Sequence, residues 1–177
     1  MPPAIVVMGV AGSGKSTVGE MIAGRLGWEF RDADSFHPAA NIAKMSAGTP
    51  LTDEDRWPWL DAIAAWIDAH RRAGTHGVAT CSALKRAYRD RLRHGRDDVL
   101  IAHLSGDFAL IAARMADRKH HFMPTSLLKS QFDTLETPAP DEHVVTVSVD
   151  DPPNAIATQV IDAAKQAADH VGFGLSR

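Results

Sequence analysis

Short apolar segments alternate along the chain with longer segments in which apolar residues recur at helical spacing. The short segments cover residues 4–8, 28–32, 77–81, 99–104 and 144–149, and we expect each to form a β-strand. The longer segments predict helices that begin near Lys15, Pro38, Thr52, Leu84, Phe108, Leu127 and Ile156. Because strands that alternate with helices favour parallel pairing, we expect an α/β fold: a five-stranded parallel sheet with helices on both faces.

One of the predicted helices is strongly basic. Leu84, Tyr88 and Leu92 have the spacing of its buried face, so Lys85 and Arg89 lie on its other faces. Two interpretations of these cations stay open: a solvated helix surface or a binding site for an anionic ligand.

Composition limits the partners. The chain has 177 residues, of which 45% are hydrophobic, and this is enough for one domain over residues 1–177. Acidic residues outnumber basic ones by 22 to 19, so no positive field draws nucleic acid or an anionic membrane, and we expect neither as a partner. The single cysteine, Cys81, fits a reducing compartment. Since the N-terminus also lacks a basic leader region, we expect a cytoplasmic protein.

A glycine-rich segment joins the first predicted strand to the first predicted helix. It matches G-x-x-x-x-G-K-[ST] and consists of Gly9, Val10, Ala11, Gly12, Ser13, Gly14, Lys15 and Ser16, with Thr17 following. In this position the motif predicts a P-loop NTPase fold, in which backbone N–H groups surround the phosphates of ATP. We expect Lys15 to contact the β- and γ-phosphates as a catalytic cation, and Ser16 to bind Mg²⁺.

Two other interpretations of this loop are weaker. A turn that only connects strand to helix would not require every motif position and both flanking elements. A GTPase switch would carry the guanine motif N-K-x-D, which the sequence lacks, and its one D-x-x-G lies at residues 169–172.

Two acidic residues follow the second predicted strand. In parallel sheets ligands bind at the carboxyl ends of the strands, which is where Asp32 and Asp34 are expected. If the chain stays extended there, both carboxylates point the same way, one toward Mg²⁺ and the other toward an acceptor hydroxyl. We therefore expect both to be catalytic, with Asp32 near the metal or acting as the base. The alternative is a polar turn or helix cap.

Further blocks of sequence continue in order to about residue 149. They include DADSFHP at 32–38, GTPLTDEDR at 48–56, CSALK at 81–85, HFMP at 121–124 and SQF at 130–132. In these blocks the chain resembles the gluconate kinase family. The resemblance implies a fold like that of nucleoside monophosphate and shikimate kinases, with a mobile lid at about residues 118–126. It also implies a homodimer that transfers the γ-phosphoryl group of ATP to the terminal hydroxyl of D-gluconate, giving 6-phospho-D-gluconate and ADP.

A site for gluconate needs a cation for the carboxylate and polar groups for the hydroxyls. The candidate cations are Lys44, Arg56, Lys85 and Arg89. The candidate hydroxyl partners are Asp34, His37 and Asn41, although His37 before a proline is also typical of a structural cap. The tryptophans at 57, 59 and 66 share a helix with apolar residues and are interpreted as packing residues.

A basic cluster falls where the resemblance implies the lid. We expect Arg114 to lie against the nucleotide, Arg118 to act as a catalytic cation near the transferring phosphoryl group, and His121 to contact the substrate. The family often has glycine where this chain has His120, which affects the expected backbone conformation of the lid.

Two alternative functions stay open on the sequence alone. One is a kinase for another small hydroxy acid such as shikimate. The other is a regulatory ATP-binding module that transfers nothing, against which the acceptor-side residues argue.

Overall fold

A parallel sheet of five strands forms the centre of the molecule. The computed structural model describes residues 1–117 and 125–172. The strands are β1 (Ala4–Met8), β2 (Glu29–Arg31), β3 (Gly77–Thr80), β4 (Leu100–Ser105) and β5 (Val145–Ser148), in the order β2-β3-β1-β4-β5. In the central register Val6 lies between Ala79 and Ile101. The predicted fold class is confirmed, and each expected strand is present within two residues of its expected ends.

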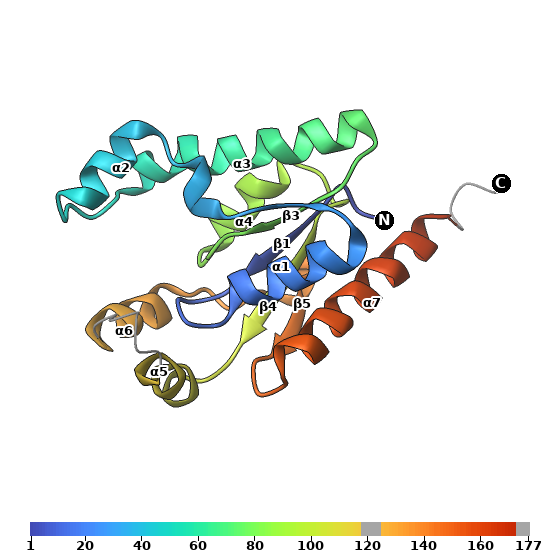
Figure 1. Ribbon diagram of the computed structural model, residues 1–177. Helices are drawn as coiled ribbons and strands as arrows, with labels where there is room; N and C mark the ends of the chain where they lie inside the picture. Colours follow the sequence, from blue (N-terminus) through green and yellow to red (C-terminus); the bar gives the residue numbers. More distant parts are fainter. Residues whose placement is uncertain (118–124, 173–177) are drawn as a thin grey trace.

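Helices cover both faces of this sheet (Figure 1). On one face lie α3 (Asp53–Ala73) and α4 (Arg86–Arg93), and on the other lie α1 (Lys15–Leu26) and α7 (Pro153–Gly172). The alternation along β1 explains this arrangement, since Val6 packs with the α3 side and Ile5 and Val7 with the α1 and α7 side. All five residues of β1 are fully buried, as expected for a strand with helices on both sides.

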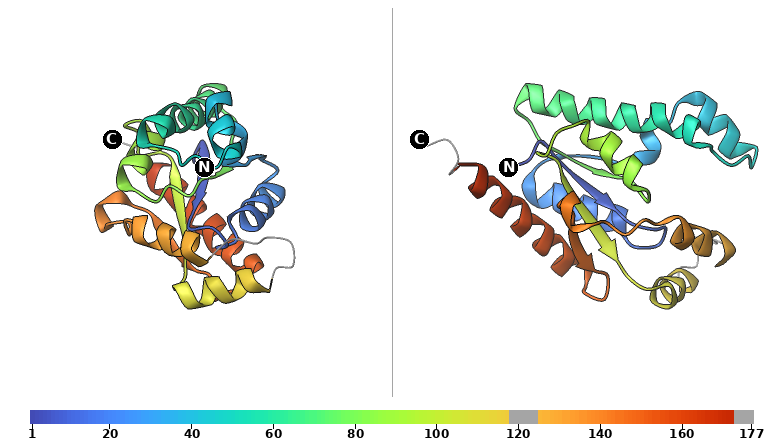
Figure 2. Two further views of the ribbon diagram at one scale, coloured as in Figure 1. Left: turned by 90° about the vertical axis from the view of Figure 1, so that its left-hand side faces the viewer. Right: turned by 180° about the vertical axis from the view of Figure 1, so that it is seen from behind.

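The remaining helices gather at the end toward which the strands point (Figures 1 and 2). They are α2 (Ala39–Ser46), α5 (Phe108–Ala116) and α6 (Thr125–Thr134). Both termini of the described chain lie at the opposite end. The carboxyl edge of the sheet is therefore bordered by α2 on one side and by α5 and α6 on the other.

Helix α3 begins where its sequence predicts. The Thr52 hydroxyl accepts a hydrogen bond from the backbone N–H of Asp55, and the Asp55 carboxylate accepts one from the backbone N–H of Thr52. This reciprocal capping box satisfies N–H groups that the first turn leaves without helical partners. The helix ends at Gly74, whose left-handed conformation (φ 67°) suits glycine.

Two short 3-10 helices were not predicted. They are η1 (Ala33–Phe36), which follows β2, and η2 (Pro140–Glu142), which precedes β5. Among the described residues no helix has both the length and the apolar character needed to cross a membrane. Of the lid expected at 118–126, residues 118–124 lie outside the described chain, and α6 begins at Thr125.

Candidate active site

The phosphate-binding loop connects β1 to α1 at the carboxyl edge of the sheet. Gly12 (φ 77°) and Gly14 (φ 91°) have left-handed backbone conformations, and Gly14 is the N-cap of α1. A Cβ at Gly12 would lie 2.5 Å from Cγ of Met115, so α5 packs directly against this part of the loop. The N-terminus of α1 adds partial positive charge at the loop.

Two cavities adjoin the loop. The first, of about 480 Å³, is lined by Ala11, Lys15 and Ser16 from the loop region and by residues that follow β2 and β3. The second, of about 350 Å³, is lined by Gly12, Ser13, Gly14, Thr17 and Arg114, and by the turn at 150–153. We name them, after the ligands that the sequence leads us to expect there, the acceptor cavity and the nucleotide cavity. A phosphate chain over the loop would connect the two.

Lys15 is directed toward the loop itself. Its Nζ donates hydrogen bonds of 3.0 Å to the carbonyl oxygens of Gly9 and Val10. Burial lowers the pKa of Lys15 below its ordinary value, and the carboxylates of Asp32 and Asp34 oppose that shift. Anionic phosphates in the loop would oppose it in the same way, which suits a lysine that binds phosphate.

Asp32 and Asp34 both line the acceptor cavity, but their geometry differs from the expectation. Asp32 caps η1, and Asp34 lies inside that turn, so the chain is not extended between them. One Asp32 oxygen accepts from the Ser16 hydroxyl at 3.1 Å, and the other accepts from the backbone N–H of Asp34, also at 3.1 Å. Both oxygens of Asp32 are thus engaged. Within the described residues the Asp34 carboxylate accepts no hydrogen bond and faces the cavity.

Ser16 and Asp32 together form a pair of hard oxygen ligands beside the loop. Mg²⁺ typically takes one or two protein ligands and completes its octahedron with water and substrate phosphates, so this pair fits it. Residues 1–117 and 125–172 contain no group of three or more His, Cys, Asp or Glu side chains that could hold a metal alone.

The four candidate substrate cations separate by position. Arg56 lines the acceptor cavity, where its guanidinium lies 3.3 Å from an Asp53 oxygen and 3.4 Å from the Tyr88 hydroxyl. Lys44 instead binds both carboxylate oxygens of Asp55 at 2.9 and 2.8 Å. Lys85 is 3.4 Å from the second Asp53 oxygen. Neither lysine lines the cavity, whereas Arg56 does.

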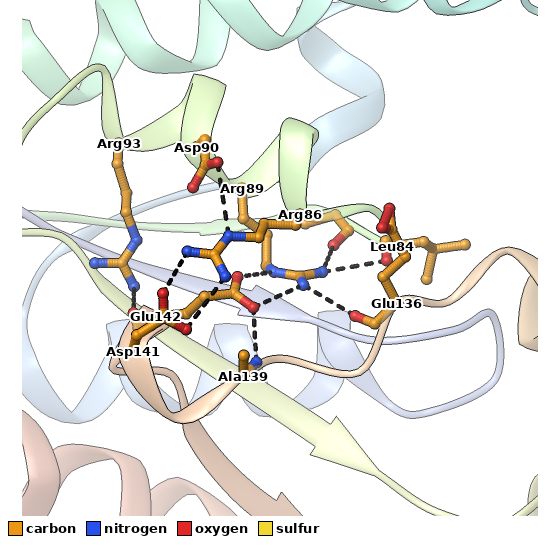
Figure 3. A network of polar contacts seen from close by, with 10 residues as sticks. Leu84, Arg86, Arg89, Asp90, Arg93, Glu136, Ala139, Asp141 and Glu142 are labelled. Carbon is orange, nitrogen blue, oxygen red and sulfur yellow. Dashed lines mark hydrogen bonds and ion pairs between the residues drawn. The ribbon is translucent and has the colours of Figure 1, made fainter.

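Arg89 was wrongly expected at the substrate. Its side chain is fully buried and pairs with Glu142 through bonds of 2.7 and 3.1 Å (Figure 3). It also donates to the backbone carbonyl oxygens of Ala83, Leu84 and Glu136 at 2.9–3.1 Å. Its donors are therefore used inside the protein, where they join α4 to the segment that follows α6. Helical spacing could not reveal this because the pairing residue is 53 positions away.

His37 lines the acceptor cavity, and the Asn41 amide contacts its ring. The His37 ring stacks on Trp59, with 4.5 Å between ring centres. The buried Asn41 amide donates to the Asp55 carbonyl at 2.8 Å and lies 3.3 Å from His37 Nδ1. Because that amide nitrogen only donates, Nδ1 accepts and Nε2 carries the proton. Burial lowers the pKa of His37, which favours this neutral form.

Arg114 lines the nucleotide cavity beside the loop, and its expected contact with the nucleotide stays a prediction. The expected lid residues Arg118 and His121 lie outside the described residues. Trp59 packs as expected, with its indole N–H bonded to the Ala33 carbonyl at 2.8 Å, but it also lines the acceptor cavity.

Several lining residues were not predicted as site residues, among them Gln131 and Cys81. Gln131, from α6, accepts a 2.6 Å hydrogen bond from the backbone N–H of Ala11 in the loop. The block SQF at residues 130–132 was part of the family resemblance, but the sequence could not show that Gln131 contacts the phosphate-binding loop. Cys81, after β3, is fully buried, and burial raises the pKa of its thiol to about 12, so it stays protonated at neutral pH.

Comparisons with known proteins show the family and the fold. The family model for shikimate kinase matches residues 11–165. A gluconokinase of Gluconobacter oxydans is 46% identical over 160 residues, which are 90% of each chain. The crystal structure of a gluconokinase from Sinorhizobium meliloti superposes with a TM-score of 0.87 at 44% identity, covering 99% of this chain and 98% of that one. The shikimate kinase of Aquifex aeolicus, at 16% identity and a TM-score of 0.58, shares the fold.

Proposed function

Because this chain belongs to the gluconokinase family, within the broader group that the shikimate kinase model describes, we propose that it phosphorylates D-gluconate. The γ-phosphoryl group of ATP passes to the terminal hydroxyl, whose proton is released, and the products are 6-phospho-D-gluconate and ADP. One observation carries the proposal: the P-loop, two carboxylates and Arg56 line the same cavity at the carboxyl edge of the sheet.

The loop residues 9–17 hold the phosphates of ATP in this proposal. Backbone N–H groups and the N-terminus of α1 face the phosphates, and Lys15 moves its ammonium group from the loop carbonyls to phosphate oxygens. Arg114 lies at the nucleoside side of the loop. Stabilising the charge on the transferring group is the main catalytic task in such reactions.

Ser16 and Asp32 are the residues that would hold Mg²⁺. When bound, the ion would neutralise part of the charge on the phosphates. The protein contributes a hydroxyl and a carboxylate already held 3.1 Å apart. Because Asp32 is engaged at both oxygens, Asp34 is the better base or orienting group for the acceptor hydroxyl.

The acceptor is held by groups that match a hydroxylated carboxylate. The planar guanidinium of Arg56 suits the gluconate carboxylate. His37 donates from Nε2, and Asp34 accepts, so that hydroxyl groups meet both kinds of partner. Lys44 and Asn41 act indirectly, through Asp55 and His37.

A coupled assay of ADP release tests the proposal. Gluconate, its epimers, shikimate and nucleoside monophosphates are offered in parallel, with Lys15→Ala as the inactive control. We expect gluconate to give the highest kcat/KM and Lys15→Ala to lose about a hundredfold or more. Preference for shikimate, or no transfer to any acceptor, would overturn the assignment in favour of one of the alternatives.

We further propose a homodimer that works in the cytoplasm. The family resemblance supports the dimer, and the single buried thiol suits a reducing compartment. Sedimentation velocity at micromolar concentration tests the dimer, and a purely monomeric species would contradict it.

A further inference from the structure

One hydrogen bond connects the phosphate-binding loop to α6. The backbone N–H of Ala11 donates to Oε1 of Gln131 at 2.6 Å, across 120 positions of sequence. The contact is short and partly buried, and Gln131 lines the acceptor cavity together with Lys15 and Asp34. Helix α6 begins at Thr125, at the end of the segment in which the lid is expected.

This bond fixes the orientation of the glutamine amide. A backbone N–H can only donate, so the atom facing Ala11 must be the carbonyl oxygen and not the NH₂ group. The NH₂ group is thereby turned away from Ala11. Within residues 1–117 and 125–172 it makes no hydrogen bond, so two donors remain at the cavity.

The position of Ala11 decides what those donors would meet. Ala11 lies on the acceptor side of the loop with Lys15 and Ser16, whereas Gly12, Ser13, Gly14 and Thr17 face the nucleotide cavity. A phosphate chain that enters from the nucleotide side would therefore end close to Ala11. Asp32 and Asp34 only accept hydrogen bonds when ionised, so phosphoryl oxygens there need donors from elsewhere.

We infer that Gln131 is a further catalytic residue: its carbonyl is anchored by Ala11 and its NH₂ group donates to an oxygen of the transferring γ-phosphoryl group. The inference rests on the proposed function. It assigns α6 a role in phosphoryl transfer, because this helix supplies the Gln131 NH₂ group that donates to the terminal phosphate of ATP. It also predicts that ADP, which lacks this phosphate, binds without using Gln131.

Two variants separate the donor from the anchor. Gln131→Glu keeps an acceptor for Ala11 but loses the donors and adds a negative charge, whereas Gln131→Met has similar length, no charge and no polar group. Gln166→Glu, on the exposed surface of α7, is the matched control for the added charge. Calorimetry with ADP and with a non-hydrolysable ATP analogue measures binding without any acceptor, and steady-state kinetics with gluconate follows transfer.

We expect both Gln131 variants to lose at least about tenfold in kcat, as for a hydrogen bond to a charged oxygen, and Gln166→Glu to match the wild type. Gln131→Met should bind ADP within about threefold of wild type and lose most of the preference for the ATP analogue over ADP.

Three results would overturn the inference. They are a normal kcat in Gln131→Met, a normal kcat in Gln131→Glu, and an equal loss of affinity for ADP and the analogue. If Gln131→Met does not fold, Gln131→Glu decides by the same readouts. A failure of the proposed function can be told apart from a failure of this inference. A wild-type protein that does not phosphorylate gluconate can still be compared with the variants by its binding of ADP and of the ATP analogue.

Discussion

Arg56 lines the acceptor cavity, which supports its proposed role with the substrate carboxylate. Of the four residues the sequence offered, Lys44 and Lys85 are bound to aspartates outside the cavity lining, and Arg89 is buried. Arg56 reaches the cavity because its helix, α3, begins at the carboxyl edge of the sheet. Its guanidinium also contacts Asp53 and the Tyr88 hydroxyl.

Arg56→Ala should therefore raise KM for gluconate by about 10- to 100-fold, the usual effect of losing a hydrogen-bonded charge, with KM for ATP changed less than about threefold. Steady-state kinetics with each substrate varied in turn measures both constants. Arg91→Ala is the matched control, because Arg91 pairs with Asp61 on the exposed surface. An equal rise in both Michaelis constants would contradict a role confined to the acceptor.

At the scale of elements, the first turn of α3 links helix capping to the wall of the site. The Asp55 carboxylate binds Lys44 of α2 and caps the helix, and these contacts lower its pKa from 3.8 to about 2. The folded state thus binds a proton less readily than the unfolded state does. The stabilisation is complete above about pH 4 and is lost as the pH falls toward 2.

Asp55→Asn should lower stability at pH 7 and flatten its decline between about pH 4 and 2. Urea unfolding at a series of pH values measures this dependence. Glu54→Gln, a neighbouring change in the same exposed turn, is the control and should keep the wild-type slope. A variant with an unchanged slope would show that other carboxylates cause the acid sensitivity.

A second link between elements is the buried pair of Arg89 and Glu142. Arg89 joins α4 to the segment 136–142 through three hydrogen bonds, two to the Glu142 carboxylate and one to the Glu136 carbonyl (Figure 3). Two more bind the carbonyl oxygens of Ala83 and Leu84. Arg89→Met should reduce the free energy of unfolding by about 3–5 kcal/mol, because Glu142 is left buried without its partner.

Denaturant unfolding checks this loss, and kinetics on the folded protein should give a KM for gluconate close to wild type. Adding Glu142→Leu removes the unpaired carboxylate and should restore part of the stability. If Arg89→Met instead kept its stability and lost gluconate affinity, Arg89 would have to be assigned to the substrate site after all.

For the whole molecule, the central feature is the arrangement of two cavities on opposite sides of one loop. Both cavities lie at the carboxyl edge of the sheet, which is bordered by α2, α5 and α6. Each ligand that binds only the folded state raises stability, by about 2.7 kcal/mol at a hundredfold excess over Kd.

We expect a non-hydrolysable ATP analogue to raise Tm by about 5–10 °C at that excess, and gluconate to raise it separately. Asp34→Asn should keep the shift with the nucleotide and lose most of the shift with gluconate, because its carboxylate faces the acceptor cavity. Differential scanning calorimetry measures both. Loss of both Tm shifts, with the nucleotide and with gluconate, would instead indicate that Asp34 acts at the metal and the phosphates.

The sequence by itself determined the features that depend on neighbouring residues. Apolar spacing predicted the five strands and the main helices, and the motif at 9–16 placed a phosphate loop between β1 and α1. These features follow from periods of two and 3.6 residues and from the conformational freedom of glycine. The ordered blocks of residues likewise indicated the family that the comparisons then showed.

Tertiary structure alone decided which polar side chains reach the site. Lys85 and Arg89 have similar sequence contexts, yet one is partly exposed beside Asp53 and the other is buried against Glu142. Asp34 faces the cavity from a 3-10 turn, and Gln131 meets Ala11 across 120 positions. The physical reason is that such partners come together only when distant segments pack, and periodicity within one element carries no information about the side chains that the other segment supplies.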